Sequence, residues 1–170
     1  MTNNHNLANL PEAAGLSGKE LMQAMIEGRL PGPSIANTMS FRLVQVGDGF
    51  AIFEGEPGAH LLNPMGTIHG GWALALIDSA AGCAAHTLLP AGAAYTTIET
   101  KVNFSRPITI ETGCVRCEGR VVSQGRQIIS AQAQLLAQDG RMLAHGTSTL
   151  MVLNPGSPPK PALSPNTPSR

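Results

Sequence analysis

The residues best suited to chemistry lie in one stretch, 63–89, where a glycine-rich loop runs into an apolar segment. Gly70 and Gly71 stand at the start of a predicted helix, although each glycine weakens a helix by about 1 kcal/mol relative to alanine. The first N–H groups of a helix have no partner within it and lie at the positive end of its dipole. This pair therefore indicates a binding point for an oxyanion or carbonyl oxygen, unless it only permits close packing against a sheet.

Asp78 is the one acidic or basic residue in the apolar segment that begins at Trp72. Residues 72–77 leave no polar face, which is typical of a helix buried inside a protein. An ionised carboxylate in such surroundings costs several kcal/mol unless it is paired or hydrogen-bonded. We therefore predict that Asp78 is an acid or base in a reaction; the structural alternative is a bond to a neighbouring hydroxyl.

The loop and the helix together follow a pattern of fixed positions, Asn63-Pro64-x-Gly66-x-x-His69-Gly70-Gly71 and then Asp78. This pattern resembles the signature of hotdog-fold acyl-CoA thioesterases of the phenylacetate-pathway (PaaI-like) family, and the resemblance covers roughly residues 17–153. It implies an α+β hotdog fold, an antiparallel sheet wrapped around a long central helix. It also implies hydrolysis of an acyl- or aryl-CoA thioester to free acid and CoA, with no cofactor and no metal ion.

The resemblance assigns site residues one by one. Gly70 N–H is the expected oxyanion donor, and one such donor supplies about 3 to 4 kcal/mol of transition-state stabilisation. Asn63 is expected to hold the carbonyl or orient the water. Asp78 is expected to act either as a general base for water or as a nucleophile that forms an anhydride, and the sequence leaves both open. For His69 we favour bracing the loop over binding the thioester.

A Ser or Thr that bonds the acid or the water is also expected on the strand at residues 95–106. We choose Thr96, because period-two alternation places it with Ile98, on the face turned toward the helix. Thr97 is the alternative if the strand shifts by one residue. Thr96 is equally well explained as an ordinary β-branched strand residue.

The spacing of Gly70 and Asp78 predicts an active site built from two chains. Eight residues separate them, so along one helix they lie about 12 Å apart and are turned roughly 80° about the axis. Reacting atoms must approach to about 3 to 3.5 Å. A two-fold dimer with antiparallel helices would bring Gly70 of one chain to Asp78 of the other. The resemblance likewise implies homodimers with shared sites, often paired into homotetramers.

Length and charge narrow the class of protein. The 170 residues suggest one domain at 17–153, preceded by a flexible N-terminus, 1–16, and followed by a disordered proline-rich tail, 154–170. Eleven basic and eleven acidic side chains cancel, which leaves no electrostatic footprint for nucleic acid or an anionic membrane. Three cysteines form no disulfide framework, and the N-terminus lacks a signal peptide, so we expect a cytoplasmic protein.

Periodicity and turn signals predict the remaining elements. A capping box of Ser17 and Glu20 predicts a helix that ends at Gly28. Strands are predicted at 41–46 and 50–56, joined by a tight turn, and then at 95–106, 113–123, 127–137 and 141–153. We expect the last four strands to form a meander.

Other kinds of site find no support. Cys114 and Cys117 are three apart on a predicted strand, so they point to opposite faces and cannot share a metal ion. Neither a nucleophile elbow nor a phosphate-binding glycine loop occurs. Two other functions stay open: a hotdog hydratase or dehydratase, for which His69 would be the acid/base histidine, and a non-catalytic acyl-CoA-binding protein.

Overall fold

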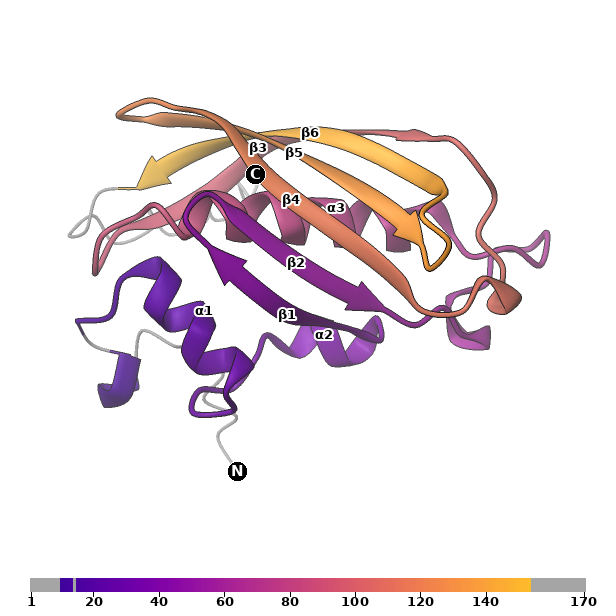
Figure 1. Ribbon diagram of the computed structural model, residues 1–170, viewed down its shortest axis with the longest axis horizontal. Helices are drawn as coiled ribbons and strands as arrows, with labels where there is room; N and C mark the ends of the chain where they lie inside the picture. The colour runs from indigo at the N-terminus through magenta and orange to yellow at the C-terminus, as the bar shows by residue number, and fades with distance from the viewer. Residues whose placement is uncertain (1–9, 14, 154–170) are drawn as a thin grey trace, which may run out of the picture.

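The computed structural model describes residues 10–13 and 15–153 (Figure 1). The predicted tail, 154–170, and most of the predicted flexible N-terminus lie outside the described residues. The domain boundaries at 17 and 153 therefore stay predictions. No helix in the described ranges is long and apolar enough to cross a membrane.

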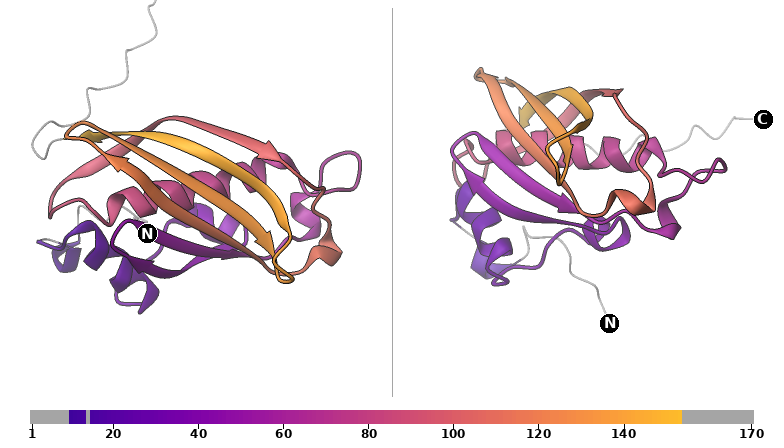
Figure 2. Two further views of the ribbon diagram at one scale, coloured as in Figure 1. Left: turned by 45° about the horizontal axis from the view of Figure 1, so that its top comes forward. Right: turned by 45° about the vertical axis from the view of Figure 1, so that its right-hand side comes forward.

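Six antiparallel strands form one sheet, in the order β1-β2-β4-β5-β6-β3. Their bounds are β1 Phe41–Gly47, β2 Phe50–Gly55, β3 Ala94–Phe104, β4 Val115–Gln124, β5 Ile128–Ala137 and β6 Met142–Leu153. The sheet curves around one long helix, α3 (Gly70–His86), which lies along its inner face (Figure 2). This confirms the predicted α+β hotdog fold.

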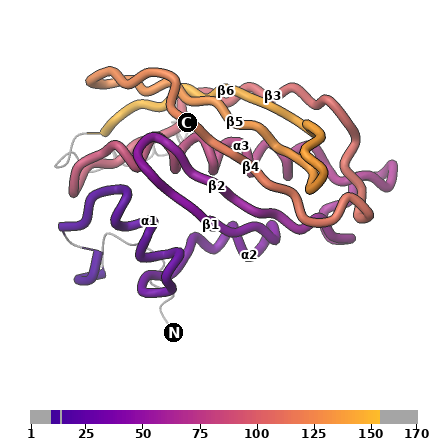
Figure 3. The backbone as a smooth tube through the Cα atoms, viewed as in Figure 1, coloured from indigo at the N-terminus to yellow at the C-terminus, as the bar shows by residue number. Residues whose placement is uncertain are grey.

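The predicted meander of four strands is wrong for its first member. β4, β5 and β6 are consecutive neighbours, but β3 pairs with β6 and β4 pairs with β2. Residues 105–114, which include the short helix η4 (Ile110–Thr112), carry the chain from the edge of the sheet back to its middle (Figure 3). Alternation along a strand reveals its two faces and not its neighbours, which is why the sequence did not indicate this crossover.

The central helix is fixed by close contact with the sheet. Nine of its residues are buried: Trp72, Ala73, Leu76, Ile77, Ala80, Ala81, Gly82, Ala84 and Ala85. A Cβ on Gly119 of β4 would lie 2.1 Å from the carbonyl oxygen of Ala80, so only glycine permits this approach. The Trp72 indole N–H donates to the carbonyl of Met39 at 2.7 Å, which anchors the first turn of α3. The helix that carries Gly70 and Asp78 is therefore rigidly placed.

The N-terminal helices cover one edge of the sheet. The predicted capping box of α1 (Gly18–Ile26) is confirmed, because Ser17 Oγ accepts from the N–H of Glu20 at 3.4 Å and Ser17 N–H donates to Glu20 Oε2 at 2.7 Å. The predicted end at Gly28 is also confirmed, since Gly28 has a φ of 72°. Short helices η2 (Pro11–Ala13), α2 (Ser34–Thr38) and η3 (Ala59–Leu61) complete the fold.

Candidate active site

The loop before α3 is held together by the side chain of Asn63. Its Oδ1 accepts from the N–H of Met65 at 2.9 Å and of Thr67 at 3.3 Å, and its Nδ2 donates to Thr67 Oγ1 at 2.8 Å. Ile68 N–H then donates to the carbonyl of Ile108 at 2.8 Å, which ties the loop to the segment after β3. Asn63 therefore braces this loop, and its contact with a carbonyl or water stays a prediction.

His69 is the N-cap residue of α3, and it selects one of the two glycine N–H groups. Its Nδ1 accepts from Gly71 N–H at 2.9 Å, so the proton of the neutral ring is on Nε2. The backbone N–H of His69 donates to the carbonyl of Leu61 at 2.8 Å. Within the described part of the chain, Gly70 N–H has no acceptor. His69 thus caps the helix start, and Gly70 has the N–H that remains for a ligand.

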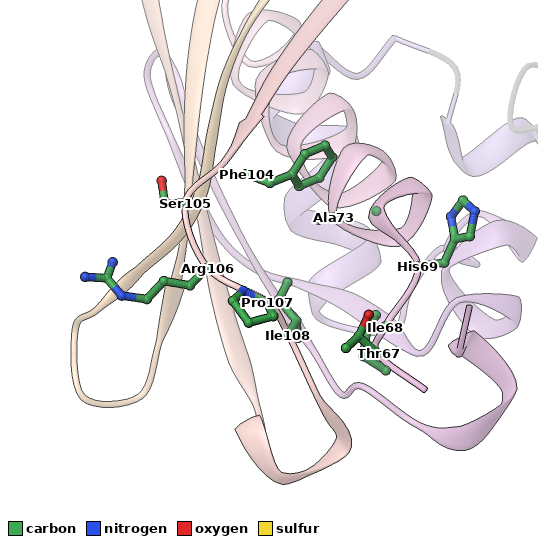
Figure 4. A pocket seen from close by; sticks show the side chains of 10 residues that line it. Thr67, Ile68, His69, Ala73, Phe104, Ser105, Arg106, Pro107 and Ile108 are labelled. Atoms are coloured by element: carbon green, nitrogen blue, oxygen red, sulfur yellow. The ribbon is translucent and has the colours of Figure 1, made fainter. Parts of the chain in front are cut away.

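A cavity of about 300 Å³ adjoins this free N–H (Figure 4). It is lined by loop residues 67–70, by Ala73 and by residues 104–108. The Phe104 ring lies over Gly70, since a Cβ on this glycine would be 3.0 Å from the end of the ring. The Arg106 side chain points away from the helix and donates to the carbonyl of Met142 at 2.8 Å. The cavity is therefore mostly apolar near Gly70.

The Asp78 carboxylate lies half-buried between α3 and β3. Its Oδ1 accepts from Thr97 Oγ1 at 3.1 Å and from Thr100 Oγ1 at 2.8 Å. The prediction that Thr96 faces the helix is wrong: Thr96 is exposed, and the alternative, Thr97, occupies the inward position. The cause is a register shift between Thr97 and Glu99, which leaves Ile98 as an extra, 55% exposed residue.

Thr100 is a partner of Asp78 that was not predicted from the sequence. Alternation places it on the helix-facing side of β3, but nothing marked it as a partner of Asp78. Its hydroxyl also lies 3.0 Å from the hydroxyl of Ser148 on β6, a residue that no sequence pattern marks. The contact with Ser148 depends on the pairing of β3 with β6, which is the part of the topology that the sequence did not reveal.

Three further titratable side chains lie beyond Asp78: Cys83 and His86 on α3, and Tyr95 on β3. Burial, and to a lesser degree the charge of Asp78, raises the pKa of the Cys83 thiol to about 12. Burial also raises the pKa of Tyr95 and lowers that of His86, whose rings meet edge to face at 5.4 Å. Because nucleophilic attack needs a thiolate, Cys83 is not a competing nucleophile near neutral pH. Asp78 is the candidate reactive group on this side of the helix, and its bonds to Thr97 and Thr100 also match the structural alternative, a carboxylate held by neighbouring hydroxyls.

The structure does not bring Gly70 and Asp78 together within one chain. They lie on one uninterrupted helix, eight residues and thus about 12 Å apart. Gly70 opens toward the cavity beside Phe104, whereas Asp78 faces Thr97 and Thr100. Among the described residues, no three His, Cys, Asp or Glu side chains are grouped as metal ligands. The candidate site therefore has two groups: the Gly70 N–H, which has no acceptor in the described part of the chain, and the Asp78 carboxylate, which accepts from two threonine hydroxyls.

The antiparallel sheet wrapped around one long helix defines the class as a hotdog-fold protein, and comparison with known proteins gives the family. The family model described as the thioesterase superfamily matches residues 65–144, which include Gly70, Asp78 and Thr97. A thioesterase family protein from Silicibacter pomeroyi is 30% identical, with 78% of this chain and 98% of that chain covered and a TM-score of 0.69. The chain therefore belongs to the thioesterase superfamily.

Two further solved structures are similar. A phenylacetic acid degradation-related protein from Ralstonia eutropha is 27% identical, with 76% of this chain and 98% of that chain covered and a TM-score of 0.70. The PaaI protein of Escherichia coli shares the fold at 19% identity, with 82% and 98% covered and a TM-score of 0.71. No curated protein matches the chain.

Proposed function

We propose that the protein hydrolyses an acyl- or aryl-CoA thioester to the free acid and CoA. The observation that carries this proposal is the pair of groups on α3: the Gly70 N–H, which has no acceptor in the described part of the chain, and the Asp78 carboxylate, held by two threonine hydroxyls. Thioester hydrolysis needs a donor for the developing oxyanion and a group that activates water or attacks the carbonyl. Membership in the thioesterase superfamily supports the same reaction.

In the general-base route, Gly70 N–H donates to the thioester carbonyl oxygen as negative charge develops there. Asp78 takes a proton from water while the water oxygen attacks the carbonyl carbon. The tetrahedral intermediate then expels the sulfur, and Asp78 returns the proton to the leaving thiolate. In the nucleophilic route, Asp78 itself attacks and an anhydride forms, which water then hydrolyses. Water that attacks the Asp78 carbonyl of this anhydride leaves its oxygen on Asp78, so ¹⁸O in the Asp78 carboxylate after a single turnover in ¹⁸O-water identifies the nucleophilic route.

The active site in this proposal is shared by two chains of a homodimer. One edge of β3 has no neighbouring strand among the described residues, and β3 carries the exposed apolar side chains of Ile98 and Phe104. An open, partly apolar edge strand favours pairing with another chain. A two-fold axis at this edge would set two α3 helices antiparallel, with Gly70 of each chain near Asp78 of the other. Pairing of two such dimers into a homotetramer belongs to the same proposal.

A panel of acyl- and aryl-CoA esters, assayed with a thiol-detecting reagent, tests the function. We expect release of free thiol by the wild-type protein and its loss in Asp78→Asn. A change in enoyl absorbance without thiol would indicate a hydratase instead. Saturable binding of the esters with neither signal would indicate an acyl-CoA-binding protein, and either result would contradict hydrolysis.

A further inference from the structure

A chain of hydroxyl groups leads from Asp78 into the interior of the sheet. Thr100 Oγ1 donates to Asp78 Oδ1 at 2.8 Å and lies 3.0 Å from Ser148 Oγ, which in turn lies 3.2 Å from the carbonyl oxygen of Glu99. Ser148 is 2% exposed, so its hydroxyl is shielded from bulk water. Among the described residues Ser148 makes no hydrogen bond to Asp78 and is linked to it through Thr100.

Thr100 and Ser148 have one hydroxyl proton each to donate. The Thr100 proton is donated to Asp78, so the Thr100 oxygen can only accept from Ser148. Ser148 then has one proton for two acceptors, Thr100 Oγ1 at 3.0 Å and the carbonyl oxygen of Glu99 at 3.2 Å. A hydroxyl that accepts a hydrogen bond becomes a stronger donor, because chains of hydrogen bonds polarise one another. When its proton points to Thr100, Ser148 strengthens the bond by which Thr100 holds Asp78.

The two oxygens of Asp78 differ as a result. Oδ1 accepts from two hydroxyls, Thr97 and Thr100, whereas Oδ2 accepts no hydrogen bond from the described residues. Every buried side-chain oxygen in the described ranges has a partner, so the unpartnered Oδ2 is open to solvent or ligand. Oδ2 is thus the oxygen that a substrate or water can reach.

We propose that Ser148 is a positioning residue, which acts through Thr100 to hold Oδ1 of Asp78 and so directs Oδ2 at the reacting centre. This inference rests on the proposed thioester hydrolysis. The chain of hydroxyls serves both chemical routes, because Oδ2 either takes the proton of water or attacks the carbonyl carbon. A group fixed in this way keeps its orientation at the moment of reaction, where a misplacement of about 1 Å costs roughly 100-fold in rate.

The test compares hydroxyl removal at three positions of the full-length protein by kcat and KM for thioester hydrolysis. Thr100→Val should lower kcat about 10- to 100-fold, as expected for loss of a hydrogen bond to a charged group, and Ser148→Ala about 2- to 10-fold. KM should stay nearly constant. Thr100→Ser, which keeps the hydroxyl, should restore most of kcat. Thr147→Val removes an exposed hydroxyl from the same strand and should leave kcat unchanged.

The double variant Thr100→Val/Ser148→Ala distinguishes positioning from general stability. If Ser148 acts through Thr100, the double variant is no slower than Thr100→Val alone, because residues in one network are not additive. Fully multiplicative losses, or a Ser148→Ala kcat equal to that of Thr147→Val, would overturn the inference. Ser148→Cys, of nearly the same size but a weak donor, gives the same comparison if the alanine variant does not fold.

Failure of the inference and failure of the proposed function are distinguishable. If the wild-type protein releases thiol and Asp78→Asn does not, but Ser148 variants match the control, only the positioning role is wrong. If the wild-type protein releases no thiol from any ester, the proposed function is wrong, and the positioning role falls with it.

Discussion

The most informative single change is Gly70→Pro, because it removes one backbone N–H and little else. Gly70 is the first residue of α3, the position at which proline is best tolerated in a helix. The residue before a proline must be extended, and His69 already has a φ of −62° and a ψ of 133°. Gly70 N–H donates to no residue in the described ranges, so its removal breaks no hydrogen bond there.

Loss of a single oxyanion donor lowers kcat by about 10² to 10³, which corresponds to roughly 3 to 4 kcal/mol. We expect Gly70→Pro to show a loss of this size. The matched control is Gly70→Ala, which keeps the N–H but adds the same Cβ. That atom would lie 3.0 Å from the end of the Phe104 ring, and the ring is 58% exposed and can shift. The alanine variant should therefore stay within about tenfold of wild type.

The assay is thiol release at saturating substrate, with thermal melting to check folding. Because the donor acts on the transition state, KM should change much less than kcat. A block of the cavity by the added Cβ would raise KM in both variants, and a block by the proline Cδ, which takes the place of the N–H proton, would raise KM in Gly70→Pro. If Gly70→Pro hydrolyses the thioester as fast as Gly70→Ala, the Gly70 N–H is not the oxyanion donor.

Three other predictions test the site and the fold. Asp78→Asn should lower kcat roughly 10²- to 10⁴-fold while leaving the melting temperature near wild type, since the amide oxygen still accepts from both threonines; near-normal turnover would contradict its role. Gly119→Ala should lower the free energy of unfolding, measured in urea titrations, by about 3 kcal/mol or more, because its Cβ would lie 2.1 Å from the Ala80 carbonyl oxygen. Unchanged stability would show that the helix can move away. Ser17→Ala should cost about 1 kcal/mol by the same titration through loss of the capping box with Glu20, and no change would mean that this cap is frayed in solution.

The central helix and its two unusual features could be predicted from the sequence because their causes are local. An apolar run without a polar face predicts burial, and paired glycines at a helix start predict unpartnered N–H groups. The structure adds what neither feature could show, that His69 caps Gly71 and leaves Gly70 free. That selection depends on one rotamer of a histidine, which spacing alone does not determine.

The partners of Asp78 could be predicted only in part because they depend on non-local geometry. Period-two alternation is correct for Thr100 and for Val102, but it fails at Thr96 and Ile98, on the other side of the register shift. A single extra residue in a strand reverses the faces on one side of it. Ser148 lies next to Thr100 because β3, at the edge of the sheet, pairs with β6. The sequence of neither strand indicates this pairing, because the two strands are far apart in the chain.

The shared site is tested most directly by a heterodimer of one Gly70→Pro chain and one Asp78→Asn chain, isolated with two different affinity tags. If Gly70 and Asp78 act on the same thioester from opposite chains, one of the two sites carries both changes and the other is wild type. A shared site then predicts about half of the wild-type kcat per dimer, from two parents that are each nearly inactive. A heterodimer no more active than its parents would contradict it.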